Sequence, residues 1–255
     1  MRILTQSAEF IRRARDKLLA QDCLLCGANS AAAILCPACA GDLKRLPKAH
    51  CPQCALPTPL GERCGRCLSQ PPYYDATVAA FVYEFPVDKL IHSFKYAHRL
   101  ALGAYFGQQL AAQAKDYAAD LATYQPIHRP IHRPTPLLTP LLIPLPLHPQ
   151  RLRERGYNQS LELARPISKV CGWPIEARLC SRTRNTPAQA GLPWRERGNN
   201  VRGAFHCNAD LSGQHIALLD DVMTTGASLN ECARTLKLHG AAQVTLFVVA
   251  RALPK

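Results

Sequence analysis

The stretch that decides the fold is residues 216–228, which read Ile216-Ala217-Leu218-Leu219-Asp220-Asp221-Val222-Met223-Thr224-Thr225-Gly226-Ala227-Ser228. An apolar run ends in two adjacent carboxylates, and a turn rich in hydroxyl groups follows. Apolar residues then recur at helical spacing: Leu229, Cys232, Ala233 and Leu236. Strand, loop and helix in this order place N–H groups at a helix N-terminus, which favours an anion. Because the carboxylates can accept hydrogen bonds from vicinal hydroxyls, the stretch predicts a sugar-phosphate site.

The same stretch resembles the motif that binds phosphoribosyl pyrophosphate (PRPP) in type I phosphoribosyltransferases. By that resemblance, the candidate catalytic residues Asp220 and Asp221 would hold the ribose 2- and 3-hydroxyls. The loop around the 5-phosphate would consist of Thr224, Thr225, Gly226, Ala227 and Ser228. An ordinary strand and helix joined by a polar turn is the alternative, but the contiguity of all the parts favours the binding motif. The stretch lacks Gly-Lys-Ser/Thr, so it is not a Walker-type loop.

Length and composition indicate a folded protein with room for one sizeable domain and a smaller module. The chain has 255 residues, of which 47% are hydrophobic. Residues 1–22 read as an amphipathic helix rather than a secretory signal, because charged and apolar positions interleave. Residues 137–147 are nearly all apolar, but three prolines interrupt them and they are too short to span a membrane. We therefore expect a cytoplasmic protein without membrane insertion.

The positive charge is unevenly distributed. The net charge is +13, and residues 151–202 contain eleven Arg or Lys against four Glu and no Asp. Such a surplus suits an anionic ligand, either a diphosphate or a nucleic-acid backbone. A solvated basic surface without a dedicated partner is the alternative.

Eight of the twelve cysteines form a repeat of Cys-x2-Cys-x9-Cys-x2-Cys with a period of 28 residues. They are Cys23, Cys26, Cys36, Cys39, Cys51, Cys54, Cys64 and Cys67. Two such paired knuckles make one tetrahedral four-cysteine zinc site. Disulfides are disfavoured without an export signal, and four tandem redox dithiols would be unusual. We expect two structural zinc ions, with no open position for catalysis. Sequential and cross-braced pairings are both open, and the short loop within each half favours the sequential one.

The cysteine repeat defines a predicted double zinc-ribbon module over residues 23–70, and Pro71-Pro72 separates it from a domain over residues 73–255. In that domain, residues 77–85 read as a strand and residues 88–114 as helical. The pattern favours a surface role for Lys95, although a basic residue there could approach a ligand. Residues 125–136 repeat Ile-His-Arg-Pro and are expected to be a low-complexity loop insertion.

Two further basic segments suit an anionic ligand. A buried strand over residues 141–147 leads into a segment with Arg151, Arg153 and Arg155, the position of the pyrophosphate loop in type I phosphoribosyltransferases. The alternation of these arginines argues that not all three face one ligand. Residues 180–189, with Arg182 and Arg184, read as a flexible lid that would exclude water from the reacting centre. A basic surface loop is the alternative for each.

With these pieces in order, the chain resembles the ComF/GntX family of competence-associated, phosphoribosyltransferase-like proteins over nearly its whole length. The segments that carry the resemblance are the cysteine repeat and residues 144–148, 151–159, 182–189, 197–205 and 216–228. The insertion over residues 125–136 departs from the family pattern, and Pro166 is expected to interrupt the helix after Asn158-Gln159. The resemblance implies an α/β type I phosphoribosyltransferase fold. This is a twisted, mainly parallel sheet flanked by helices, with the ligand at its carboxyl edge.

The resemblance also implies a role in handling DNA taken up for natural competence or as a nutrient. Single-stranded DNA and DNA-uptake proteins would then be partners. Three functional classes remain open: an active phosphoribosyltransferase using PRPP with Mg²⁺, a PRPP or nucleotide sensor without turnover, and a DNA-binding adaptor. The first two need the same pocket, whereas the third would rest on the zinc ribbons and the basic stretch.

Overall fold

The computed structural model of the chain describes residues 21–123, 139–185 and 201–254. Nearly all of the predicted N-terminal helix and the whole predicted insertion over residues 125–136 lie outside these ranges. The chain forms two compact units, which divide between Lys44 and Arg45.

The first unit contains the first half of the cysteine repeat. Its helix α2 (Pro37–Gly41) begins after Cys36, whose sulfur accepts a hydrogen bond from the N–H of Cys39 at 3.5 Å. Pro37 stands at the first helical position, where its missing N–H costs nothing because that donor has no partner within a helix. This local geometry turns the Cys36 and Cys39 side chains towards one another.

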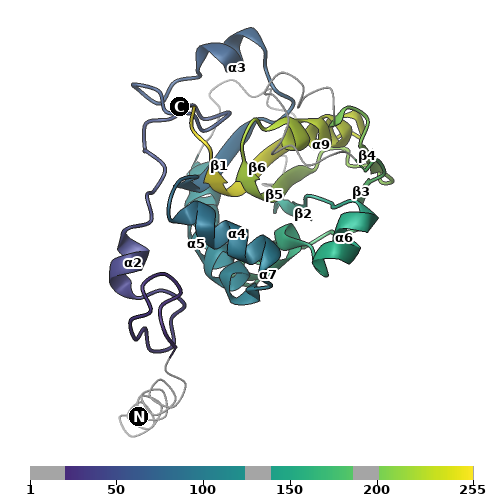
Figure 1. The fold of residues 1–255 in the computed structure, drawn as a ribbon. Coiled ribbons are helices and arrows are strands. Elements are labelled where there is room, and N and C mark those ends of the chain that lie inside the picture. Colours follow the sequence, from purple (N-terminus) through teal and green to yellow (C-terminus); the bar gives the residue numbers. More distant parts are fainter. Residues whose placement is uncertain (1–20, 124–138, 186–200, 255) are drawn as a thin grey trace, which may run out of the picture. The chain divides into compact units, whose positions relative to one another are not determined.

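The second unit is built on a four-stranded parallel sheet (Figure 1). Its strands are β1 (Ala76–Val82), β2 (Leu141–Pro144), β5 (His215–Met223) and β6 (Gln243–Arg251), in the order β1-β6-β5-β2. A separate antiparallel pair joins β3 (Cys180–Arg182) to β4 (Phe205–Cys207). Nearly every residue of β5 and β6 is buried, as expected for central parallel strands covered on both faces.

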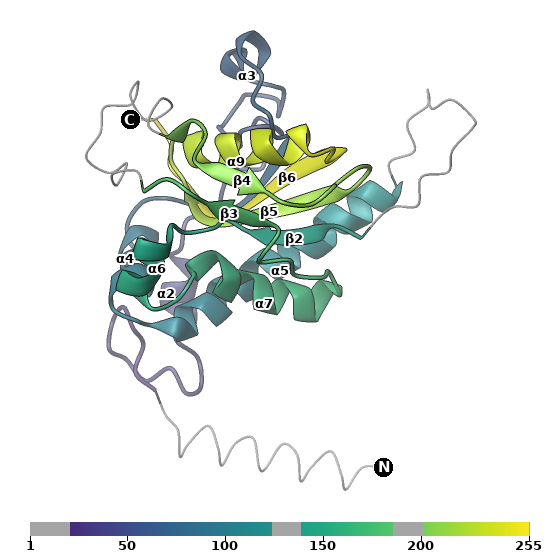
Figure 2. The ribbon, with the colours of Figure 1, turned by 90° about the vertical axis from the view of Figure 1, so that its right-hand side faces the viewer.

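Helices cover both faces of the sheet (Figure 2). The helices of this unit are α3 (Gly65–Ser69), α4 (Val87–Tyr96), α5 (Leu100–Thr123), α6 (Pro149–Arg155), α7 (Gln159–Cys171) and α9 (Ala227–Leu238). Helices α4, α5 and α7 lie on one side of the sheet and α9 on the other. This layered arrangement of a parallel sheet and flanking helices confirms the predicted fold class.

The helical character expected over residues 88–114 is confirmed by α4 and α5, between which the chain turns with His98 at φ +52°. The expectation about Pro166 was wrong. Pro166 does not interrupt α7, which runs through it to Cys171. The ring is accommodated because α5 carries Gly107 opposite it, where even a Cβ atom would lie 2.7 Å from Pro166 Cγ.

The second half of the cysteine repeat shares its core with the sheet. Cys51, Cys54 and Cys67 are buried in one apolar cluster with residues of β1, β5, β6 and α9. Thr77 of β1 donates from its N–H to the carbonyl of Pro52 at 3.0 Å and from its hydroxyl to the carbonyl of Gln53 at 2.6 Å. The boundary between compact units therefore falls inside the module predicted over residues 23–70.

Candidate functional site

The two adjacent carboxylates stand at the carboxyl end of β5, and α9 begins six residues after the second one. Between them, Gly226 caps α9 in the left-handed conformation at φ +79°, which favours glycine over residues with a Cβ atom. The hydroxyl of Thr225 accepts a hydrogen bond from the N–H of Ala227 at 3.2 Å. The structure thus forms the predicted strand, loop and helix N-terminus over residues 216–228.

Asp221 is held by a lysine from a distant part of the sequence. Its side chain is 2% exposed, and its Oδ1 lies 2.8 Å from Lys95 Nζ at the end of α4. Burial lowers the pKa of Lys95, but the carboxylates of Asp221 and Asp220 raise it by more, so the pKa lies above its ordinary value. Asp221 Oδ2 is buried without a hydrogen-bond partner among the described residues, so it has unused capacity to accept a hydrogen bond.

Asp220 is partly exposed, and its surroundings disfavour the ionised form of its carboxyl group. Burial, followed by the neighbouring charge of Asp221, raises the pKa of Asp220 to about 7. Lys95 and two hydrogen bonds oppose the shift. One bond comes from the Ser160 hydroxyl at 3.2 Å, and the other from the N–H of Asp221 at 2.9 Å. A ligand that donates hydrogen bonds or brings a cation would therefore stabilise the ionised form.

The predicted pyrophosphate loop is the short helix α6 followed by Gly156, which ends the helix at φ +79°. A helix forms because His148 caps it and Pro149 stands at its first position. Helical spacing places Arg151 and Arg155 on one face and leaves Arg153 exposed on another. Arg155 lies over the ring of Tyr96, 5.3 Å from its centroid, next to Lys95 in the chain. The expectation that the arginines do not all face one ligand agrees with this helix.

Arg182 is brought to the same region by β3. Burial and the charge of Arg151 lower the pKa of Arg182, whereas Asp220 raises it, so these three charged groups interact. The side chain is 7% exposed and lies over the ring of Phe205 in β4. The predicted lid over residues 180–189 therefore begins as a paired strand. Arg184 is exposed and donates to the carbonyl of Arg202, and residues 186–189 lie outside the described ranges.

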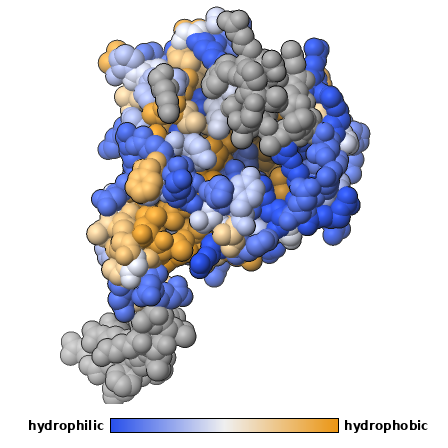
Figure 3. All heavy atoms as spheres, viewed as in Figure 1, coloured by the Kyte–Doolittle hydropathy of each residue, from blue (hydrophilic) through white to orange (hydrophobic). Residues whose placement is uncertain are grey.

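The surface around these groups is mostly polar. Figure 3 shows hydrophilic side chains over the side of the second unit that carries α6, β3 and β4. Apolar contacts cannot dominate binding there, so a charged, hydrogen-bonding ligand fits this side best.

The eight repeated cysteines form two clusters in sequential pairing, the arrangement that the short loops favour. Within each cluster, the four sulfur atoms all lie within 4.8 Å of one another. Zn–S bonds of about 2.3 Å in a tetrahedron would space the sulfurs about 3.8 Å apart. The structure has 3.8 Å between the sulfurs of Cys26 and Cys36, and 3.5 Å between those of Cys54 and Cys64. The donor sets therefore fit zinc.

Hydrogen bonds from backbone N–H groups lower the pKa of some of these thiols. Hydrogen bonds from the N–H groups of Cys26 and Cys36 lower the pKa of Cys23 to about 6. Burial raises the pKa of Cys51, but the N–H groups of Cys64 and Cys54 outweigh it and bring the value to about 7. In the same clusters, burial raises the pKa of Cys54 to about 11 and also raises that of Cys67, and hydrogen bonds with Cys26 and Cys36 raise that of Cys39. Because zinc binds the thiolate form, Cys23 and Cys51 are the two of these five that ionise most readily.

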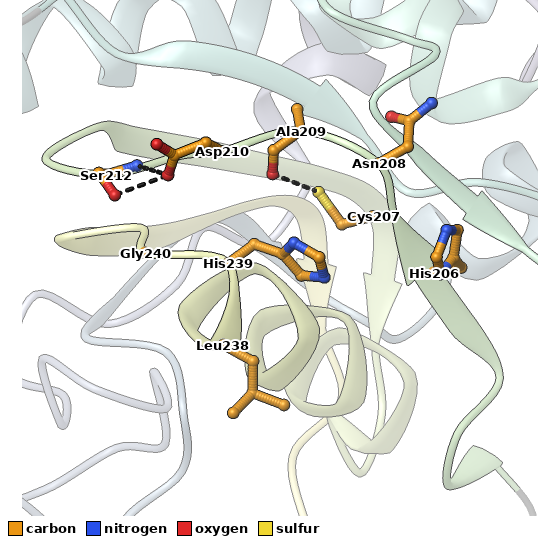
Figure 4. Close-up of a pocket in the computed structure, with 9 residues that line it drawn as sticks. All are labelled: His206, Cys207, Asn208, Ala209, Asp210, Ser212, Leu238, His239 and Gly240. Atoms are coloured by element: carbon orange, nitrogen blue, oxygen red, sulfur yellow. Dashed lines mark hydrogen bonds between the residues drawn. The ribbon is translucent and has the colours of Figure 1, made fainter.

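A second hollow lies at the other end of the sheet, where β4 leads to β5 and α9 leads to β6 (Figure 4). Its carboxylate, Asp210, is turned towards Ser212 and accepts hydrogen bonds from the N–H at 2.9 Å and the hydroxyl at 2.6 Å. The single carboxylate of this hollow is thus satisfied by its own turn. We place the candidate site at the carboxyl end of β5 instead.

A parallel sheet with this loop at its carboxyl edge, joined to two four-cysteine sites, defines a phosphoribosyltransferase-like protein with a double zinc ribbon. The double zinc ribbon domain family matches residues 14–68. DNA utilization protein YhgH of Escherichia coli (strain K12) is 33% identical over 212 residues, which cover 82% of this chain and 87% of that protein. Competence protein F of Haemophilus influenzae is 29% identical over 86% of this chain and 90% of its own. The chain belongs to the ComF/GntX family.

Solved structures add a distant likeness. Hypoxanthine phosphoribosyltransferase from Trypanosoma cruzi matches with a TM-score of 0.36 and 13% identity, over 58% of this chain and 63% of that one. Across residues 21–123, 139–185 and 201–254, no helix combines the length and apolar character that crossing a membrane requires.

Lys95 and Ser160 are the site residues that sequence reasoning missed. Lys95 was interpreted as a surface lysine because α4 is amphipathic and its local pattern carries no sign of the carboxylates 126 residues away. Ser160 follows Asn158, the N-cap of α7, and is fully buried. The only sequence signal for Ser160 was that a small polar residue stood on the buried face of a predicted helix.

The raised pKa of Asp220 predicts opposite effects for substitutions at the two carboxylates. Between the ordinary pKa of about 3.8 and the folded value of about 7, the folded state keeps a proton that the unfolded state has released. The contribution of Asp220 to stability therefore falls as the pH rises through this window. Asp220→Asn should melt at a higher temperature than the wild type at about pH 8, with a smaller gain near pH 5.5.

A net gain of about 1 kcal/mol, discounted for the partial exposure of the carboxyl, corresponds to roughly 2–4 °C for a chain of this size. Calorimetric melting across the pH range measures it. The matched control is Asp221→Asn, which should lower the melting temperature because it leaves the Lys95 ammonium without its carboxylate partner. An Asp220→Asn variant that is no more stable than the wild type at about pH 8 would contradict the raised pKa of Asp220.

Proposed function

We propose that the chain binds PRPP, or a nucleotide carrying the same ribose 5-phosphate, at the carboxyl end of β5. The observation that carries the proposal is the strained acid pair Asp220 and Asp221 beside a helix N-terminus, with Arg151, Arg155 and Arg182 nearby. An anion at the start of α9 would gain from the helix dipole and the loop amides. Vicinal hydroxyls would donate hydrogen bonds to the two carboxylates, where Asp221 Oδ2 has unused capacity.

The arginines support a diphosphate on the other side of the ribose. Guanidinium groups bind phosphate oxygens through paired hydrogen bonds and keep their charge at any physiological pH. In phosphoribosyl transfer, the bond between the anomeric carbon and a pyrophosphate oxygen breaks, pyrophosphate leaves with the electron pair, and an acceptor attacks the carbon. Arg151, Arg155 and Arg182 would stabilise the departing charge, which is the main contribution expected of a preorganised site. Mg²⁺ bound to the PRPP oxygens would neutralise part of that charge.

We further propose that this site serves the handling of DNA taken up by the cell. The names of the two relatives, DNA utilization protein YhgH and Competence protein F, support that setting. The basic surplus around residues 151–202 suits a single-stranded DNA backbone. Two structural zinc ions would fill the cysteine clusters, and reduced thiols require a reducing compartment such as the cytoplasm.

A titration of PRPP with Mg²⁺ into the zinc-loaded protein tests the binding site. The wild type should bind saturably by calorimetry. An Asp220→Ala/Asp221→Ala double variant should bind roughly a hundredfold more weakly, because hydrogen bonds to two charged groups are lost. Asp116→Ala on the exposed side of α5 is the control and should bind as the wild type does. Equal affinities for the double variant and the wild type would contradict the proposal.

The three arginines of α6 provide a matched test of the diphosphate side. Arg151→Ala and Arg155→Ala should each weaken binding of inorganic pyrophosphate by roughly tenfold, because each removes a charge-assisted contact. Arg153→Ala removes the same charge from the same helix, but its side chain is exposed on another face, so pyrophosphate affinity should be nearly unchanged. Equal losses for all three variants would indicate a diffuse effect of net charge, in line with the DNA-binding alternative. Calorimetry at two salt concentrations separates these outcomes.

A further inference from the structure

Arg251 is an unusual residue for the end of a core strand. It closes β6 after a run of fully buried apolar residues, and its own side chain is 1% exposed. A buried guanidinium requires hydrogen-bond acceptors on every side. Arg251 obtains them from backbone carbonyls of two distant segments, which are the second four-cysteine loop and the proposed phosphate loop.

On one side, Arg251 Nε donates to the carbonyl oxygen of Cys54 at 2.8 Å. On the other, Nη1 donates to the carbonyl oxygens of Met223, at 2.9 Å, and Thr224. Nη1 also contacts the carbonyl oxygen of Ala252 at 2.8 Å. One planar side chain thus connects a metal-ligating knuckle to the first two peptide groups of the loop after β5.

These bonds orient the loop. In a trans peptide the C=O and N–H bonds point in opposite directions. Because the carbonyls of Met223 and Thr224 point at Arg251, the N–H groups of Thr224 and Thr225 point away from it. Reorientation of either peptide would break a hydrogen bond to a buried charge. Arg251 therefore helps to fix the direction in which two potential phosphate donors point. For the Thr224 N–H it acts together with the backbone bond from the Ala252 N–H to the Met223 carbonyl at 3.0 Å, and for the Thr225 N–H through its own bond to the Thr224 carbonyl.

Two further contacts connect the same segments. Gln53, within the knuckle, donates from its side chain to the carbonyl of Tyr74 at 3.0 Å. Tyr74 is buried, and its hydroxyl lies 3.5 Å from the place where a Cβ on Gly226 would stand. The N–H of Tyr73 donates to the side chain of Asn230 in the first turn of α9 at 2.7 Å. The phosphate loop and the start of α9 are thus both tied to the segment that follows the second cysteine site.

We propose that Arg251 is a positioning residue that couples metal binding at Cys51, Cys54, Cys64 and Cys67 to the shape of the sugar-phosphate loop. The inference rests on the proposed function, because it takes residues 224–228 as the phosphate-binding loop. It assigns the two zinc sites different roles. The second site supports ligand binding, and the proposal assigns no such role to the first, whose four cysteines belong to the other compact unit.

Linkage provides a test in the wild-type protein. If metal at the second site favours ligand binding, ligand must favour metal there by the same factor. The experiment first establishes by calorimetry that zinc-loaded wild type binds ribose 5-phosphate. It then measures the equilibrium affinity for zinc by competition with a coloured chelator, with and without saturating ribose 5-phosphate. We expect one of the two zinc equivalents to bind roughly tenfold more tightly with ligand and the other to be unchanged, a coupling of typical size.

Variants then assign the protected site. Cys23→Ser/Cys26→Ser, which disables the first site, should retain the protected zinc equivalent. Arg251→Lys keeps the charge but cannot reach both segments with a planar fork, so it should lose the protection and bind ribose 5-phosphate more weakly. Its affinity for inorganic pyrophosphate, which rests on α6, should stay at the wild-type value, whereas general unfolding would remove both.

The outcomes separate the inference from the function it rests on. If the wild type does not bind ribose 5-phosphate, the proposed function fails. If it binds but neither zinc equivalent is protected, or if the protected equivalent is lost with Cys23→Ser/Cys26→Ser, the coupling through Arg251 is wrong. Protection that persists in a folded Arg251→Lys variant would show that Arg251 does not carry the coupling. Should Arg251→Lys fail to fold, zinc affinities of the wild type and of the first-site variant still decide whether the second site is coupled to the ligand.

Discussion

Two neighbouring carboxylates at the end of a buried strand have to be neutralised or hydrogen-bonded, and residues of α4 and α7 meet part of that requirement. Asp221 is paired with Lys95 from α4, and Asp220 accepts from Ser160 of α7. Removing Lys95 would leave the buried Asp221 carboxyl without its ion-pair partner, so the site depends on this contact between α4 and β5. The pKa of Asp220 remains raised to about 7, which leaves a site that gains from a ligand with donor groups.

The same edge of the sheet also carries groups of the opposite sign. Helix α6 follows β2, the neighbour of β5, and brings Arg151 and Arg155 to the region of the acid pair, while β3 adds Arg182. Because the parallel strands β2 and β5 end at one edge, the segments that follow them converge there, and the separate β3–β4 pair contributes Arg182. The second cysteine site belongs to the same unit and contacts the proposed phosphate loop through Arg251. Its buried cysteines thus belong to the core that supports the candidate site.

The local parts of this arrangement could be predicted from the sequence, whereas the long-range pairings could not. The contiguous patterns of residues 216–228 predict the strand, the loop and the helix. The cysteine spacing predicts each four-sulfur cluster because every cluster closes within one short loop. Lys95 and Arg251 reach their partners only through the packing of α4 and the pairing of β5 with β6, and neither has a local signature. The helical form of α6 was missed because three arginines and a glycine suggested a loop, whereas His148 and Pro149 cap a helix.

The central claim is that residues 220–228 hold a ribose 5-phosphate. The most direct measurement is a crystal structure of the zinc-loaded protein soaked with ribose 5-phosphate. The account predicts the phosphate at the N-terminus of α9, within hydrogen-bonding distance of the N–H groups of residues 224–228, and the ribose hydroxyls against Asp220 and Asp221. A phosphate bound instead at the hollow between His206 and Gly240, or an empty loop at saturating ligand, would contradict it.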